Sequence, residues 1–188
     1  RSSVVGGLTA VSHLCRKKLL HYSAVSHVGF VLPGVASLTA EGVNGALYQM
    51  VSHGRLSAML FLIAGVLYDR THDRRIDSYR GLMQPMPQYT VLTAIAFFAS
   101  LGLPGFSGFV GELFTLMGGF QSAWLPGLLT ALATTGILLA AAFFLWPLQR
   151  SFFGPSWSRL APPHLLHPLP LPEQALVSPL SVVAFGTV

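Results

Sequence analysis

Long apolar runs, separated by short polar or basic stretches, make up most of this sequence. A helix that crosses the hydrocarbon core of a bilayer needs about 20 predominantly apolar residues. Full spans are therefore expected at 20–40, 43–68, 89–120 and 124–149, and partial ones at 2–14 and 174–188. The stretch 150–173 is rich in Pro and His and is predicted to be an extended connection.

The span 89–120 is unusual because its 32 residues exceed what one crossing needs. A straight helix of that length measures about 48 Å, whereas the hydrocarbon core is about 30 Å thick. Pro104 and Gly105 offer a break, since Pro removes a backbone donor and Gly relaxes the chain. The predicted fold is an all-α, polytopic transmembrane helix bundle, a single domain over 1–188, with one Gly/Pro-broken helix near 103–105. The freed backbone groups need partners, which favours a buried polar core.

Composition supports a membrane protein. The chain is 52% hydrophobic and 9% charged, whereas soluble domains carry about 25% charged residues. Cys15 is the single cysteine and cannot form an internal disulfide, and no Cys/His spacing predicts a metal site. The start lacks Met and a signal-peptide pattern, and the end stops inside an apolar run, so we expect a fragment of a longer polytopic chain.

The net charge of +5 is a topology signal. Alternating spans place nine Lys and Arg residues on one side: Arg16, Lys17, Lys18, Arg70, Arg74, Arg75, Arg80, Arg150 and Arg159. The opposite connections, near Glu41 and Gln121, carry none. The basic side is therefore expected to be cytoplasmic, or the matrix side in an organelle. Lys17 and Lys18 are expected to anchor the chain at the membrane boundary. The predicted partner is therefore the lipid bilayer, and no nucleic-acid partner is expected.

Ionisable side chains inside the spans are the candidate functional residues: Glu112, His27, His53 and Arg55. A carboxylate in hydrocarbon is costly and usually functional, and His can carry protons near physiological pH. The spans holding the two histidines are expected to turn near residue 42, which separates the histidines by roughly 6 Å in depth. We predict that Glu112, His27 and His53 form a proton relay. A water or a Ser hydroxyl could bridge the gap, and the supporting polar residues are Ser26, Ser52, Gln49, Lys17 and Lys18.

Other interpretations of these residues stay open from sequence alone. Each histidine could be a buried packing residue bonded to a carbonyl, and Glu112 could be the salt-bridge partner of a basic side chain on another helix. Paired axial haem ligation is a further reading, with Gly29 and Gly54 leaving room for the ring. Arg55 receives no role. No phosphate-binding loop, dinucleotide fingerprint or nucleophile elbow occurs, so we expect no cofactor and no catalytic residue in this chain.

Ordered motifs resemble one known family, the M-type antiporter-like membrane subunit of respiratory complex I, the proton-pumping NADH:quinone oxidoreductase. The resemblance covers about residues 6–154 and rests on the segments 17–30, 44–54, 68–72, 81–83 and 100–112. It departs from the family pattern at four positions, namely Cys15, His21, Pro33 and Arg55. None of these is a predicted relay residue.

The resemblance implies a C-terminal fragment of a fourteen-helix subunit, with its full spans as helices ten to thirteen and a broken twelfth helix. By position, Glu112 matches the family's carboxylate in the broken helix, and His27 and His53 match its central-axis histidines. The resemblance further implies that NADH, flavin, iron–sulfur clusters and quinone belong to partner subunits. Other membrane-arm subunits are the implied protein partners.

These expectations combine into one functional hypothesis. The chain is predicted to be a multi-pass integral membrane subunit, in a bacterial inner membrane, that couples quinone reduction to proton pumping and carries out no bond chemistry itself. The first alternative is a subunit of a multi-subunit sodium/proton antiporter. The second is a structural membrane arm that has lost pumping. The Ser-His-x-Gly-Phe pattern at 26–30 favours the complex I member of the family.

Overall fold

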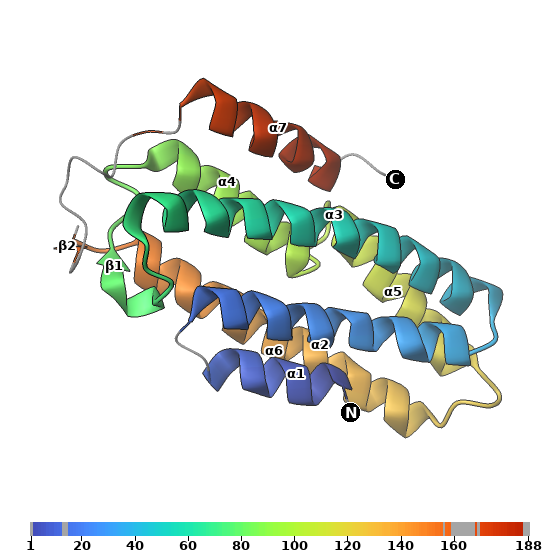
Figure 1. The fold of residues 1–188 in the computed structure, drawn as a ribbon. Coiled ribbons are helices and arrows are strands. Elements are labelled where there is room, and N and C mark those ends of the chain that lie inside the picture. The colour runs from blue at the N-terminus through green and yellow to red at the C-terminus, as the bar shows by residue number, and fades with distance from the viewer. Residues whose placement is uncertain (1, 13–14, 156, 159–167, 169, 186–188) are drawn as a thin grey trace.

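The computed structural model describes residues 2–12, 15–155, 157–158, 168 and 170–185, and these residues form a bundle of helices (Figure 1). The helices are α1 (Ser2–Ser12), α2 (Arg16–Ala36), α3 (Ala40–Thr71), the short η1 (Ile76–Ser78), α4 (Pro87–Ser100), α5 (Ser107–Gln121), α6 (Gly127–Phe152) and α7 (Leu171–Phe185). The short strands β1 (Tyr79–Arg80) and β2 (Trp157–Ser158) pair antiparallel.

The architecture confirms the predicted all-α transmembrane bundle. Among the described residues, α2, α3 and α6 are each long and apolar enough to cross a bilayer. The predicted broken helix is also present, because α4 ends at Ser100 and α5 begins only at Ser107. Gly102 and Gly105 adopt positive φ angles of 72° and 99° between the two half-helices. These are left-handed backbone conformations that glycine adopts readily.

The turn between α2 and α3 lies at 37–39, so the predicted turn near residue 42 is wrong. Thr39 caps α3, because its side-chain oxygen accepts a 3.1 Å hydrogen bond from the Gly42 N–H. Glu41 lies in the first turn of α3, where the helix dipole stabilises a negative charge. The polar residues that suggested a connection are therefore the normal start of a helix.

The connection 150–173 is shorter than predicted, because α6 continues to Phe152 and α7 begins at Leu171. Its described part includes β2, which pairs with β1 in the register Tyr79↔Ser158 and Arg80↔Trp157. Much of the rest, Arg159 included, lies outside the described residues. So do residues 13–14 and 186–188 of the predicted partial spans.

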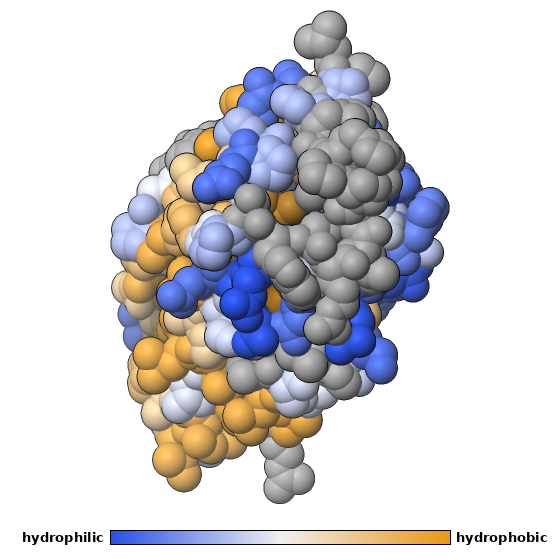
Figure 2. All heavy atoms as spheres, turned by 90° about the vertical axis from the view of Figure 1, so that its left-hand side faces the viewer, coloured by the Kyte–Doolittle hydropathy of each residue, from blue (hydrophilic) through white to orange (hydrophobic). Residues whose placement is uncertain are grey.

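Basic residues gather at one end of the bundle, where α2 begins and α3 and α6 end (Figure 1, left). Figure 2 looks onto this end and shows hydrophilic residues across it and apolar residues along the flank. Two ion pairs lie here, Arg70–Glu173 and Arg150–Asp77, each with a nitrogen–oxygen distance of 2.5 Å. This arrangement matches the one-sided positive charge that the sequence predicted.

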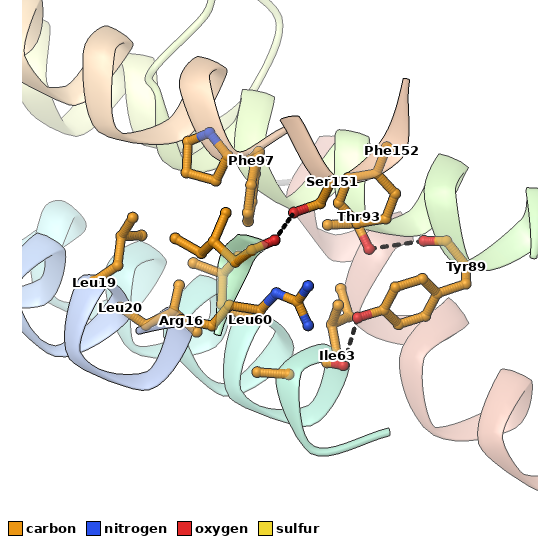
Figure 3. A pocket seen from close by; sticks show the side chains of 13 residues that line it. Arg16, Leu19, Leu20, Leu60, Ile63, Tyr89, Thr93, Phe97, Ser151 and Phe152 are labelled. Atoms are coloured by element: carbon orange, nitrogen blue, oxygen red, sulfur yellow. Dashed lines mark hydrogen bonds between the residues drawn. The ribbon is translucent and has the colours of Figure 1, made fainter. Parts of the chain in front are cut away.

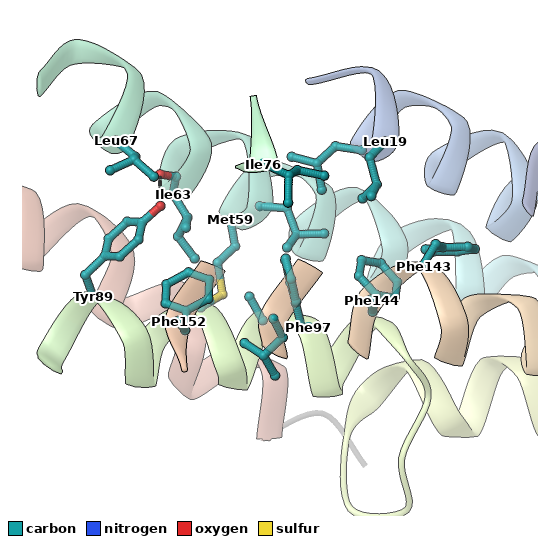
Figure 4. Packing of buried hydrophobic residues seen from close by; sticks show 14 of the residues in the cluster. Leu19, Met59, Ile63, Leu67, Ile76, Tyr89, Phe97, Phe143, Phe144 and Phe152 are labelled. Atoms are coloured by element: carbon teal, nitrogen blue, oxygen red, sulfur yellow. Dashed lines mark hydrogen bonds between the residues drawn. The ribbon is translucent and has the colours of Figure 1, made fainter. Parts of the chain in front are cut away.

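A buried apolar cluster fills the space between α2, α3, α4 and α6 (Figure 4). Leu19, Met59, Phe97 and Phe144 meet there from these four helices. Between helices in lipid, such packing contributes through close contact and van der Waals attraction, because the lipid tails are as apolar as the side chains. The cluster lies on the basic-end side of the candidate site and fixes α2, α3 and α6 around it.

Glycines bring α3 and α5 into very close contact. A Cβ on Gly45 of α3 would lie 2.5 Å from the backbone nitrogen of Thr115, and a Cβ on Gly118 of α5 would lie 2.3 Å from the Cα of Gly42. Small residues at such a seam let two helix backbones approach closely, which drives helix association in membranes. This seam holds α5, and with it Glu112, against α3.

We expect Gly45→Ala to destabilise the protein by about 1–3 kcal/mol, because the new methyl group overpacks the α3–α5 seam. Gly65→Ala on the same helix is the matched control, since a Cβ there meets nothing within 4 Å. Ala has the higher helix propensity, so the control should be neutral or slightly stabilising. Thermal unfolding in detergent micelles checks both variants, and equal unfolding temperatures would contradict the close seam.

Asp73 organises the loop that follows α3. Burial alone raises the pKa of its carboxyl, but hydrogen bonds from Ser78 Oγ and from the N–H groups of Arg75 and Arg74, together with the charge of Arg16, outweigh burial and lower that pKa. The loop is therefore a hydrogen-bonded structure.

A carboxyl whose folded-state pKa is lowered stabilises the fold above its unfolded pKa and loses that effect as the pH falls through the folded value. Asp73→Asn should therefore lower the unfolding temperature at neutral pH, and the difference from the unchanged protein should shrink below about pH 4. The exposed Asp69 supplies the control variant, Asp69→Asn. A pH-independent difference for Asp73→Asn would show that its charge is not what stabilises the loop.

Candidate functional site at a buried histidine–glutamate contact

Three helices bring the predicted relay side chains together inside the bundle. His27 lies on α2, His53 on α3 and Glu112 on α5. His27 Nδ1 lies 3.2 Å from Glu112 Oε1, and the ring centroids of His27 and His53 lie 5.5 Å apart. His27 and Glu112 are only 3% and 4% exposed, whereas His53 is half-buried. The side chains therefore form a continuous row from His53 through His27 to Glu112.

The helix break presses against the carboxylate of Glu112. A Cβ on Gly102 would lie 2.6 Å from Glu112 Oε2, and the φ angle of Gly102 is +72°. Both the backbone conformation and the close approach therefore require glycine at this position. At the start of α5, Ser107 Oγ accepts a 2.9 Å hydrogen bond from Ser52 Oγ on α3. The break and α3 together fix the direction in which Glu112 points.

The His27–Glu112 contact offers two positions for one proton. A carboxylate accepts a hydrogen bond from a protonated Nδ1, whereas a protonated carboxyl donates to a bare Nδ1. The sequence alternative of a salt bridge to a basic residue on another helix is thus met by a histidine, His27 of α2. The rings of Phe143 and Phe144 lie 6.2 and 5.9 Å from the His27 ring centroid and keep this contact apolar around its edge.

His53 faces the site from α3 and has a hydroxyl partner one turn away. Ser57 Oγ lies 3.2 Å from His53 Nε2. Between His53 and His27 lies a cavity of about 10 Å³, which both histidines line. This volume is about that of one water, so it leaves no room for a macrocycle. The haem interpretation is therefore incompatible with the packing of the two histidines.

The predicted supporting residues Ser26, Ser52 and Gln49 are buried but do not surround the relay as expected. Ser52 bonds Ser107 rather than a relay group. Gln49 packs against α5, with its side-chain oxygen 2.3 Å from where a Cβ on Gly111 would lie. Ser26 faces α1, since its Oγ lies 3.5 Å from a Cβ on Gly7. These residues position helices around the site.

Lys17 and Lys18 are exposed at the basic end. They precede His27 by about ten residues of α2, or roughly 15 Å, so they lie outside the site. This position suits the predicted boundary anchors. Their neighbour Arg16 behaves differently, because its guanidinium turns inward over the Tyr79 ring, 4.9 Å from the centroid.

Arg16 lines a second cavity of about 40 Å³ nearer the basic end (Figure 3). Most of its walls are apolar, and its polar lining residues are Arg16, Tyr89, Thr93 and Ser151. Leu20 and Leu60 line both this cavity and the smaller one between the histidines. Sequence reasoning missed this feature, although the spacing of 16, 20, 23 and 27 places Arg16 on the helix face of His27.

Ser57 and Ser100 are two polar residues of the site that sequence reasoning also missed. Ser57 had a detectable signal, because it lies four residues after His53 on the same helix face. Ser100 had none, because it is the last residue of α4 and its approach to the histidines depends on where the helix breaks.

Comparison with known proteins now adds to this geometry. Residues 1–138 match the family described as NADH:quinone oxidoreductase/Mrp antiporter, TM. The chain belongs to this family. The family resemblance predicted from the motifs is therefore confirmed, and so is the assignment as an integral membrane protein.

Relatives in this family include NADH-quinone oxidoreductase subunit M of Rhodobacter capsulatus, 45% identical over 152 residues, which are 80% of this chain and 29% of the relative. NADH-ubiquinone oxidoreductase chain 4 of Chondrus crispus is 42% identical over 151 residues, which are 80% of this chain and 30% of the relative. The chain thus spans about 30% of the length of these relatives.

Solved structures show the same fold. One is a chain in the structure of respiratory complex I from Thermus thermophilus with bound NADH, with a TM-score of 0.87 and 36% sequence identity. The match covers 98% of the present chain and 37% of the Thermus chain. Another is a chain of the Mrp complex from Dietzia sp. DQ12-45-1b, with a TM-score of 0.78 and 26% sequence identity. That match covers 88% of the present chain and 31% of the Dietzia chain.

The contact between the break and Glu112 generates a prediction. Gly102→Ala should move the Glu112 carboxylate away from its present position, because a methyl group 2.6 Å from Oε2 is too close. Gly105→Ala is the control, since Gly105 also has a positive φ but a Cβ there meets nothing within 4 Å. High-resolution structures of the two variants check the prediction. An unmoved carboxylate in Gly102→Ala would contradict it.

Proposed function

We propose that this chain belongs to a proton-translocating membrane-arm subunit of an NADH:quinone oxidoreductase, and that His53, His27 and Glu112 carry the proton. One observation carries the proposal: a buried, titratable His27–Glu112 contact of 3.2 Å with His53 next to it. Ionisable residues at membrane depth are rare and usually mark ion or proton paths. The names of the relatives support the reaction class.

The energetics of the contact suit proton transfer. An isolated charge in the bilayer interior is costly, but a proton shared between imidazole and carboxylate leaves either a neutral pair or a compact ion pair. Because the two groups are in contact, a proton can pass directly between His27 Nδ1 and Glu112 Oε1. His53 then supplies the next proton position along the row.

The proposed direction of proton movement is inferred from the charge at the two ends of the bundle. The basic end is expected to face the cytoplasm, because Lys and Arg are retained on that side during insertion. We infer that the protein lies in a bacterial inner membrane. Protons move from His53 through His27 to Glu112 and leave at the opposite end, where α5 ends.

The redox chemistry is proposed to take place in other subunits. NADH, flavin, iron–sulfur clusters and quinone are assigned to partner subunits, with other membrane-arm subunits as direct neighbours. In this proposal the chain transfers protons and carries out no redox chemistry. Quinone reduction elsewhere alters the electrostatics of the row and so drives the transfer.

Glu112→Gln tests the proposal, because Gln keeps the shape and removes the titratable proton. We expect NADH-driven proton uptake into sealed vesicles to fall roughly tenfold or more, with quinone reduction slowed in parallel, in the assembled complex. Glu41→Gln, at the other end of α3 from the basic loop, is the control and should pump normally. Normal pumping by Glu112→Gln would leave Glu112 as a structural partner of His27.

The second candidate is a subunit of a multi-subunit sodium/proton antiporter. The family description and the structural match to the Mrp complex both favour keeping it. Its signature is sodium-dependent proton movement without NADH. Vesicles that take up protons only with NADH, at a rate independent of sodium, support the oxidoreductase; the opposite pattern supports the antiporter.

A further inference from the structure

The side chain of Arg16 turns into the bundle at the basic end and lines the cavity of about 40 Å³ (Figure 3). Its Nη2 atom is buried and has no hydrogen-bond partner within the described part of the chain. The guanidinium lies over the Tyr79 ring and points toward Tyr89 of α4. Buried charges in proteins are normally paired and hydrogen-bonded, so an unsatisfied cationic donor at a cavity indicates a ligand.

A carboxylate that could balance this charge is engaged elsewhere. The charge of Asp73 acts on Arg16, but among the described residues the two side chains do not form an ion pair. The Asp73 carboxylate instead accepts hydrogen bonds from Ser78 Oγ and from the Arg75 N–H. Removal of a cation from water costs several kcal/mol unless a charge of opposite sign compensates it closely. The Arg16 guanidinium therefore lacks a directly contacting counterion in this part of the chain.

The cavity is small and mostly apolar. One water needs about 10–15 Å³ by this measure, so 40 Å³ holds one chloride-sized ion or about two to three waters. Its walls include Leu20, Ile63, Phe97 and Phe152, from α2, α3, α4 and α6. Phosphate or sulfate needs several hydrogen-bond donors and has a larger cost of desolvation, and these walls do not supply the donors. The cavity therefore suits a single monovalent ion.

The hydroxyl groups at the cavity differ in whether they can donate to an anion. The Thr93 hydroxyl donates to the Tyr89 carbonyl at 2.7 Å, and the Tyr89 hydroxyl donates to the Ile63 carbonyl at 2.9 Å. The Ser151 hydroxyl lies 3.5 Å from its acceptor, a carbonyl of η1, which is at the limit of a hydrogen bond. Ser151 Oγ and Arg16 Nη2 are therefore the donors that remain for a ligand.

We propose that this cavity binds one monovalent halide ion, chloride under ordinary conditions, held by Arg16 Nη2 and the Ser151 hydroxyl. The ion balances the charge of the guanidinium, whereas a water molecule satisfies only its hydrogen bond. It also joins the start of α2 to the end of α6, which carry these two residues. This counterion site is separate from the row of His53, His27 and Glu112 and does not depend on proton transfer there.

An outer pocket gives anions a route to this cavity. It has a volume of about 180 Å³ and is lined by Arg16, Lys17 and Arg74 together with one carboxylate, Asp73. A cleft with an excess of positive charge raises the local concentration of anions. Arg16 lines both the outer pocket and the enclosed cavity. An anion from the basic surface therefore reaches the cavity past the Arg16 side chain.

Thermal unfolding of the full-length protein in detergent micelles tests the site, with chloride compared to gluconate at equal ionic strength. At a chloride concentration ten times its dissociation constant, the ratio of folded to unfolded protein should rise about elevenfold, so the unfolding temperature increases. Sulfate should not replace chloride. Arg16→Gln should abolish the difference between chloride and gluconate, because it removes the buried cation. The same unfolding temperature in chloride and gluconate for the unchanged protein overturns the proposal.

Arg80→Gln is the matched control, because it removes one positive charge from an exposed residue at the same end of the bundle. It should keep the full chloride effect. An equal loss of the effect in Arg16→Gln and Arg80→Gln, or its persistence in Arg16→Gln, shows that chloride acts elsewhere and overturns the site.

A direct measurement does not depend on any variant. Crystals of the full-length protein grown with bromide in place of chloride should give a bromine anomalous peak between Arg16 Nη2 and Ser151 Oγ. Bromide is a halide of similar size and the same charge, so it should occupy the same position. Density there without an anomalous peak identifies water and overturns the anion site.

Discussion

The contact between His27 and Glu112 is the interaction on which the rest of the site depends. It joins α2 to α5 at 3.2 Å, and no single helix could form it. The contact forms only if α5 begins at the correct position along the bundle axis. The break at Gly102 and the Ser52–Ser107 hydrogen bond set that position. The cost of burying two ionisable groups is reduced because each lies within hydrogen-bonding distance of the other.

Close helix packing on one side of this contact permits polarity on the other. The Gly45–Thr115 and Gly42–Gly118 approaches hold α3 and α5 together without side-chain bulk. Elsewhere in the bundle, aromatic rings pack around His27, and a small cavity remains beside the two histidines. The seam is therefore the support that allows small polar spaces to persist in an otherwise apolar bundle.

Much of the fold was predictable from sequence, and the reason is the bilayer. Its thickness fixes span length, so the apolar runs and the over-long span at 89–120 were informative, and rare charges identified Glu112, His27 and His53. The turn between α2 and α3 was predicted near residue 42, but it lies at 37–39. The difference arises because Glu41, a residue type common in loops, lies in the first turn of α3. Ser100 was missed because its neighbours are set by the position of the break, which no periodicity encodes.

The proposed proton exchange between His27 and Glu112 needs no large motion, because the two groups are already in contact. A unit charge about 10 Å away interacts with the transferred proton by roughly 1.7 kcal/mol at an effective dielectric constant of about 20. The two proton positions lie on atoms 3.2 Å apart. The interaction therefore differs between them by at most about 0.4 kcal/mol, which changes their ratio roughly twofold. Such a charge biases the proposed exchange without committing the proton to one side. The break, the glycine seam and the aromatic rings give these two groups a rigid surrounding.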